Sequence, residues 1–304
     1  MIGVGTTIFL VNPQTFGGTS YLLDTYSATS AYSLRQLKTG VTNVVRVRRS
    51  GDNAESDFTA TDITDGSLVT WVVAGGGLEN GDIVKWYDQS GNSINATQTT
   101  AAAQPRLVAS GALVTDADGN NALDFQAGGD SMLVFGNGNV YNNKSYGAAF
   151  CVYENDSSSR RDLWGWHTPN QNFSRFTSSD SITASRHSVV TRRLDADGVT
   201  LLTDGVNFPT GVKLRTDIID WANNDAFIRR DGSQVASSTS HGTAGSTSST
   251  NSYIVMRADQ TSGIGKSYTN TPVQYMTELI FFNTDISGDI SSIESDINTH
   301  YSIY

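Results

Sequence analysis

The stretch that decides the fold is Trp86-Tyr87-Asp88-Gln89-Ser90-Gly91-Asn92, which lies inside a longer run from Val84 to Leu107. Its apolar and aromatic beginning favours a β-strand. The Asp, Gln, Ser, Gly and Asn that follow are side chains that satisfy the backbone of a tight turn. Residues 96–98 then resume an extended run, and Pro105 limits the next piece to an edge strand or a turn. A strand with such an amide-rich turn is typical of a rim loop on a β-sandwich, where these folds place recognition.

Short apolar runs follow this stretch at regular intervals, and turn residues such as Asp118-Gly119-Asn120 separate them. The first four runs are residues 107–108, 112–114, 122–125 and 132–135. Short strands at this spacing predict an all-β sandwich or barrel. The pattern continues through most of the remaining chain, and no internal repeat of solenoid or propeller length interrupts it.

Two segments carry helical spacing. In residues 28–37, Ala31, Leu34 and Leu37 are three apart, which predicts a short helix. Near the C-terminus the apolar side chains recur at three and four residues, at Ile290, Ile293, Ile297 and Tyr301. This second pattern predicts one short amphipathic helix that closes the chain.

The charge of the chain narrows the possible functions. The formal net charge is −10 and the sequence pI is about 4.7. Binding to nucleic-acid phosphates or to anionic lipid requires a basic face. The N-terminal residues lack the basic and apolar regions of a signal peptide, and no window approaches the roughly 18 apolar residues of a membrane span. We therefore expect neither nucleic-acid binding nor membrane insertion.

The opening stretch also resembles a hallmark of concanavalin A-like lectin/glucanase (laminin G-like) domains. Two earlier segments match the same pattern, Ala31-Tyr32-Ser33-Leu34-Arg35 and residues 45–55, and together they cover roughly the first third of the chain. The pattern is found in the catalytic sandwich of family 54 α-L-arabinofuranosidases and in many tail-fibre and virion proteins of bacteriophages. The resemblance implies a jelly-roll β-sandwich with an extended N-terminal arm and a short C-terminal helix.

We expect two parts in the chain, an arm of residues 1–25 and a sandwich domain of residues 26–304. The arm has a short strand candidate at Ile8, Phe9 and Val11, followed by Gly17-Gly18. It either anchors the chain to other virion proteins by strand addition or forms an edge strand of its own sandwich. The first alternative makes a homo-oligomer the expected state.

The sequence offers little for glycoside hydrolysis, which needs two carboxylates that face the sugar. None of the five Glu residues stands in an acidic doublet. The arabinofuranosidases that share the hallmark carry adjacent cysteines in the substrate pocket, whereas this chain has only Cys151. Glu278 is the best single candidate, because it lies in a late apolar strand on the face of Met276 and Ile280, where its pKa would rise. The alternative is a structural hydrogen bond to a neighbouring loop.

Glycan binding is better supported, because it requires aromatic rings for sugar faces and amides or carboxylates for hydroxyls. Three groups of residues provide this combination, with Trp86 and Trp164 expected in the core instead. The candidates are Trp166, His167 and Asn170; Trp221, Asn223 and Asp225; and Asp88 and Asn92. We expect stacking on Trp166 or Trp221, beside polar loops at one end of the sandwich.

No cofactor is expected. Residues 116–120 and 195–198 resemble fragments of a calcium loop, but neither has the Glu of an EF-hand, so plain turns are favoured and calcium is the alternative. The sequence thus predicts a non-enzymatic bacteriophage virion protein, made in the host cytoplasm, that presents a lectin-like domain to host-surface glycans from a fibre, tail or capsid-decorating position. The alternatives are a glycoside hydrolase of α-L-arabinofuranosidase type and a purely structural coat protein.

Overall fold

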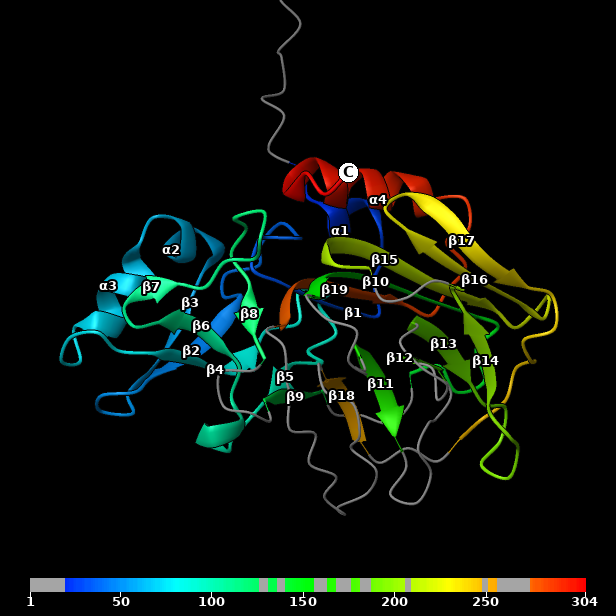
Figure 1. Cartoon of the computed structure of the whole chain (residues 1–304), viewed down its shortest axis with the longest axis horizontal. Helices are drawn as coiled ribbons and strands as arrows, with labels where there is room; N and C mark the ends of the chain where they lie inside the picture. The colour runs from blue at the N-terminus through cyan, green and yellow to red at the C-terminus, as the bar shows by residue number, and fades with distance from the viewer. Residues whose placement is uncertain are drawn as a thin grey trace, which may run out of the picture.

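A computed structural model describes residues 20–125, 131–135, 140–155, 163–167, 176–180, 187–205, 209–247, 251–255 and 274–304. Two antiparallel sheets stack in this part of the chain, and three short strands join them (Figure 1). The first sheet has the order β17 (Ser233–Ser238), β16 (Asp225–Arg230), β15 (Gly211–Asp220), β10 (Tyr146–Asn155), β19 (Gln274–Phe282), β1 (Ser30–Ser33). The expected all-β sandwich is confirmed.

The second sheet is built from shorter strands. It contains β4, whose last residue, Trp86, begins the hallmark stretch of residues 86–92. Its order is β14 (Thr200–Thr203), β13 (His187–Thr191), β12 (Phe176–Asp180), β11 (Trp164–His167), β18 (Asn251–Val255), β9 (Met132–Phe135), β5 (Ala96–Thr97), β4 (Gly81–Trp86), β2 (Val45–Arg49), β3 (Glu55–Phe58). The joining strands are β6 (Arg106–Ala109), β7 (Ala112–Leu113) and β8 (Leu123–Asp124), and β8 pairs with both β6 and β19.

Short helices complete the described chain. They are α1 (Leu22–Thr25), α2 (Ala60–Thr64), α3 (Ser67–Val73), the 3₁₀ helix η1 (Ala101–Ala103) and α4 (Ile290–Tyr301). The expected C-terminal helix is α4, and it lies with α1 over the outer face of the first sheet (Figure 1). Within the described residues, none of these helices has the length and apolar character needed to cross a membrane.

The alternation of side chains along β10 explains why the molecule has two cores. Phe150 and Val152 face outward and pack with Ile293 of α4. Cys151 and Tyr153 face inward and pack with the second sheet. Because successive side chains of a strand point to opposite faces, one apolar strand supplies both layers.

A β-bulge interrupts the same alternation on β19. Val152 lies opposite Glu278 and Tyr153 lies opposite Met276, so Thr277 is the extra residue. A bulge changes the direction of the side chains on one side of it. Met276 therefore packs between the sheets, while Glu278 faces α4. The prediction that Glu278 shares a face with Met276 is wrong, because the extra residue reverses the face.

The predicted helix at residues 28–37 is also wrong. Its first half is strand β1, which pairs with β19 and places Ser33 opposite Glu278. The three-residue apolar spacing there is a weak local signal, and pairing with the free edge of β19 outweighs it. Leu22 and Leu23 of α1 are buried beneath α4, so residues 21–25 belong to the sandwich domain and not to the arm. Residues 1–19 lie outside the described part, and for them the arm stays a prediction.

Trp221 is buried in the core, so its removal should destabilise the fold. Its side chain is 2% exposed and its ring lies 6.0 Å from that of Tyr141 and 6.1 Å from that of Phe176. Trp221→Ala should lower the free energy of unfolding by about 3–5 kcal/mol, because it leaves a large cavity between the sheets. Urea unfolding followed by circular dichroism measures this loss. Leu78→Ser, at a side chain that is 84% exposed, is the control and should leave stability nearly unchanged.

Candidate functional site

The hallmark stretch ties a loop of the chain to the sandwich. The Gln89 side chain is fully buried, and its Oε1 accepts a hydrogen bond from the Leu37 backbone N–H at 2.8 Å. Its Nε2 donates to the carbonyl oxygens of Ser33 and Arg35, at 3.0 and 2.9 Å. A buried amide with all these partners fixes the backbone it contacts. Gln89 therefore fixes the path of the backbone through Arg35, just after β1.

Asp88 has a similar internal role. One carboxylate oxygen accepts hydrogen bonds from the backbone N–H groups of Ala31 and Ser90, each at 2.9 Å. The other accepts from the Ile94 N–H at 3.0 Å and from the Ser90 hydroxyl at 2.8 Å. The turn is thus organised by its own acid, and these four bonds occupy the groups that a ligand would need. The prediction that Asp88 binds glycan is corrected, because its oxygens are used within the fold.

A buried ion pair lies where β1, β19 and α4 meet. The Nε of Arg35 donates to Oε2 of Glu278 at 2.8 Å, and its Nη2 donates to Oε1 at 3.1 Å. The hydroxyls of Ser33 and Tyr301 also donate to Oε2, at 2.7 and 3.0 Å. Arg35 further contacts the Asp296 carboxylate of α4 at 2.8 Å. Three separate elements thus converge on one carboxylate.

The protonation of Glu278 follows from these contacts. Burial acts to raise the pKa of the carboxyl, but Arg35 and the two hydroxyls outweigh it and hold the pKa below its ordinary value. Glu278 is therefore ionised at neutral pH. The expected rise in its pKa is wrong, because apolar neighbours along the strand do not reveal an arginine that arrives from another segment.

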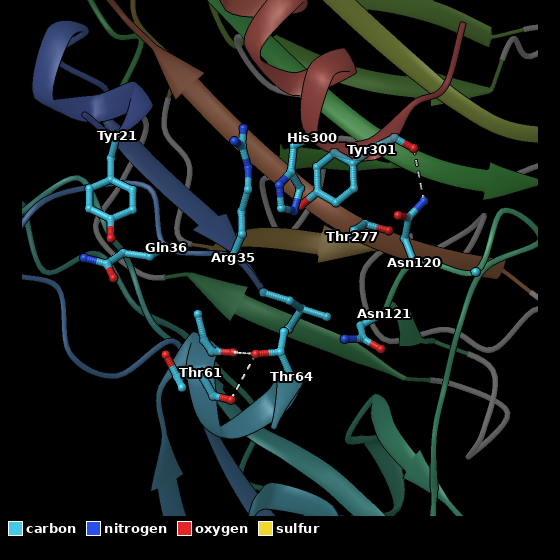
Figure 2. A pocket seen from close by; sticks show the side chains of 13 residues that line it. Tyr21, Arg35, Gln36, Thr61, Thr64, Asn120, Asn121, Thr277, His300 and Tyr301 are labelled. Carbon is cyan, nitrogen blue, oxygen red and sulfur yellow. Dashed lines mark hydrogen bonds between the residues drawn. The ribbon is translucent and has the colours of Figure 1, made fainter. Parts of the chain in front are cut away.

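A pocket of about 400 Å³ opens beside this ion pair (Figure 2). Helix α2, the segment just after β1, the turn at residues 119–121, the bulge of β19 and the end of α4 line it. Its lining residues are Tyr21, Leu34, Arg35, Gln36, Ala60, Thr61, Thr64, Gly119, Asn120, Asn121, Thr277, His300 and Tyr301. The volume is within the range of small-ligand sites, about 300–1,000 Å³.

The lining of this pocket is polar and mostly uncharged. Hydroxyls and amides dominate it, and none of the described lining residues is an Asp or a Glu. Burial, assisted by the neighbouring Arg35, lowers the pKa of His300, so its imidazole is neutral at neutral pH. The described hydrogen bonds within the chain leave the side chains of Thr61 and Asn121 unused. Neutral donors and acceptors of this kind match the hydroxyls of a sugar.

The residues predicted from the sequence lie elsewhere. The Trp221 ring is in the core, so the prediction that it stacks on a sugar is corrected. Asn223 donates to Asp220 at 2.7 Å and Asp225 begins β16, at the far end of β15 from the pocket. Asn92 is exposed, but its amide donates to the carbonyl oxygens of residues 28 and 29. The side chains of Trp166 and His167, and all of Asn170, lie outside the described residues, so these three stay predictions.

Several pocket residues carried a sequence signal that pointed to structure and not to binding. Arg35 ends a segment of the hallmark, Tyr301 ends the apolar stripe of α4, and Thr277 is a strand residue. The bulge places Thr277, the hydrogen bonds of Gln89 fix the backbone of Arg35 and the docking of α4 places Tyr301, and none of these is visible in local spacing. Asn120 follows Asp118 and Gly119 in a segment whose pattern predicts a turn between strands, with calcium binding as the alternative.

The first of the two candidate calcium turns is organised by its own aspartate. Asp116 accepts hydrogen bonds from the backbone N–H groups of Asp118 and Asn120, at 3.0 and 2.9 Å, which is the pattern of a plain turn. No cluster of His, Cys, Asp and Glu with the geometry for a metal was found among the described side chains.

Comparison with known proteins places the fold. The sequence matches no protein-family model and no curated protein. The structure is similar to a family 54 α-L-arabinofuranosidase soaked with a cyclic sulfate inhibitor, with a TM-score of 0.54 and 13% identity over 89% of this chain and 62% of that chain. An arabinofuranosidase complexed with arabinofuranosyl-α-1,2-xylobiose gives a TM-score of 0.50 and 14% identity, with the same coverage.

A third similar structure is the binding domain of Paraclostridial Mosquitocidal Protein 1, with a TM-score of 0.50 and 10% identity over 71% of this chain and 50% of that chain. The chain spans about three fifths of the length of the arabinofuranosidases. At these identities the likeness concerns the fold. The predicted concanavalin A-like sandwich, resembling that of the family 54 enzymes, is therefore confirmed.

The ion pair predicts a dependence of stability on pH. Because the folded pKa of Glu278 lies below its unfolded value, its contribution is present above the unfolded pKa and is lost as pH falls through the folded pKa. Glu278→Gln should lower the free energy of unfolding by about 3 kcal/mol at pH 7, since the buried guanidinium loses its main partner. Urea unfolding at several pH values from 7 down to 3 should show that the difference in the free energy of unfolding between the wild type and Glu278→Gln decreases in acid.

The matched control is Glu55→Gln, because Glu55 pairs with Arg46 in an exposed ion pair. Glu55→Gln should lower the free energy of unfolding at pH 7 much less than Glu278→Gln, since exposed pairs contribute little. Equal losses for the two variants, or an advantage over Glu278→Gln that does not change with pH, would contradict a structural role for the buried pair.

Proposed function

We propose that this chain is a non-enzymatic, lectin-like domain of a bacteriophage virion that binds a host-surface glycan in the pocket between α2, β19 and α4. The observation that carries the proposal is the lining of that pocket, in which neutral hydroxyl and amide groups surround a space of small-ligand size. Sugars present hydroxyl groups that both donate and accept, so such a lining matches them without a net charge.

The fold supports the same proposal. The similar structures include an arabinofuranosidase complexed with an arabinofuranosyl-xylobiose and the binding domain of a mosquitocidal protein. A sandwich of this kind therefore occurs in a protein that binds a sugar, the arabinofuranosidase, although a fold alone does not assign a function. The virion assignment is supported by the resemblance of the stretch around Trp86 to tail-fibre and virion proteins.

The chemistry of Glu278 favours binding over hydrolysis. A general acid must hold a proton near neutral pH, which requires a raised pKa. The pKa of Glu278 is lowered instead, and Arg35, Ser33 and Tyr301 occupy its two oxygens. A second carboxylate, that of Asp296, contacts the same guanidinium. The arrangement thus holds two anions around one cation and leaves neither as a proton donor to a ligand.

The single site is expected to be weak and to act through many copies. A small polar ligand gains little beyond the hydrogen bonds it gave up to water. Display of many domains on one particle makes later contacts intramolecular and raises the overall affinity by orders of magnitude. A phage fibre or capsid provides such a display.

Binding can be tested on a glycan array with the monomer and with a multimeric form of the full chain. The multimeric form should bind, and Thr61→Ala and Asn121→Ala should each weaken binding by about three- to tenfold, the loss of one neutral hydrogen bond. Thr243→Ala is the matched control, because Thr243 is exposed in a loop outside the pocket. Unchanged binding in both pocket variants, with a loss in Trp166→Ala, would move the site to the loops first predicted from the sequence.

The enzymatic alternative has its own measurement. Incubation of the chain with an aryl α-L-arabinofuranoside and with arabinan should release no product above the blank, because Glu278 is ionised and fully engaged. Turnover that is abolished in Glu278→Gln, in a variant shown to be folded by circular dichroism, would replace the binding proposal by a glycosidase.

A further inference from the structure

The only permanently charged side chain among the described lining residues of the pocket is Arg35. An arginine can bind the carboxylate of an acidic sugar, because its planar fork pairs with a carboxylate through two parallel N–H groups. In this chain that fork is already occupied. Nε and Nη2 of Arg35 donate to the two oxygens of Glu278, at 2.8 and 3.1 Å.

Asp296 adds a second negative charge at the same guanidinium. Its Oδ1 lies 2.8 Å from Nη2 of Arg35, and its side chain is 38% exposed, so it remains in contact with solvent. One guanidinium thus faces two carboxylates, and the net charge of these three groups is negative. The whole chain carries the same sign, with a formal net charge of −10. An incoming carboxylate therefore meets repulsion both at the site and on approach.

We infer that the pocket selects an uncharged sugar and rejects one that carries a carboxylate. This inference rests on the proposed function and specifies its ligand class. To clamp a sugar carboxylate through Nε and Nη2, Arg35 would have to release Glu278, which is fully buried and would be left without its cation. The loss of a partner by a buried charge outweighs the gain of a partner at the partly solvated mouth of a pocket. A neutral sugar requires no such exchange, because Thr61 and Asn121 are available to its hydroxyls.

The test uses the full chain in multimeric form on an array of matched pairs, in which each neutral sugar is printed beside its uronic acid, such as galactose with galacturonic acid and glucose with glucuronic acid. At low ionic strength at least one neutral member should bind tenfold or more tightly than its uronic acid. Added salt should narrow that ratio, since salt screens the partly exposed charge of Asp296.

Asp296→Asn tests whether the preference for neutral sugars comes from the charge beside the pocket. It should improve binding of the uronic acid about three- to fivefold and leave the neutral partner unchanged, the size expected for one partly exposed charge. The matched control is Asp289→Asn, the same change of charge at the exposed N-cap of the same helix α4. It should leave the ratio as in the wild type.

The outcomes separate the two proposals. Equal or tighter binding of the uronic acids, lost in Asn121→Ala, would overturn the inference and leave glycan binding in the pocket intact. Equal effects of Asp296→Asn and Asp289→Asn would also overturn it, because the discrimination would then come from overall charge. If no sugar of either kind binds the multimeric chain, the proposed function fails and the inference fails with it.

Discussion

The fully buried carboxylate of Glu278 imposes the constraint on which the pocket region depends. A charge in an apolar interior persists only when cations and hydrogen-bond donors surround it. Here the donors come from β1, from the segment after it and from the last turn of α4. Each element must reach the same point, so the position of β1, the direction of the loop and the docking of the helix are settled together.

The hallmark stretch serves this constraint from a distance. Gln89 and Asp88 hold the backbone of residues 31–37, and that backbone carries Arg35 to Glu278. Trp86, fully buried between the sheets, anchors the start of the turn. A turn that reads as a recognition loop in the sequence is therefore an internal support. The pocket lies at the end of the segment it supports.

The sequence predicted the fold better than the site. Alternating and short apolar runs, such as that of β10, report directly on packing, and the sandwich and helix α4 follow from them. The prediction of a helix at residues 28–37 is wrong because this segment pairs with β19, which is far away in the sequence and invisible to local spacing. The prediction that Trp221 binds a sugar is wrong because the polar residues beside it in the sequence do not reveal the aromatic cluster that surrounds its ring. The pocket escaped prediction because its walls come from segments far apart in the chain, and one inserted residue decides which side chains face it.

That inserted residue, Thr277, has a consequence for the evolution of such domains. Removing it would leave Glu278 opposite Val152 and Met276 opposite Tyr153, so both side chains would keep their present faces while the alternation along β19 became regular. A relative of equal sheet topology but without the extra residue would then keep its anchor for α4 and lose only the part of the pocket lining that Thr277 provides. The length of a single strand, counted against its partner, would thus alter the pocket without altering the ion pair beside it.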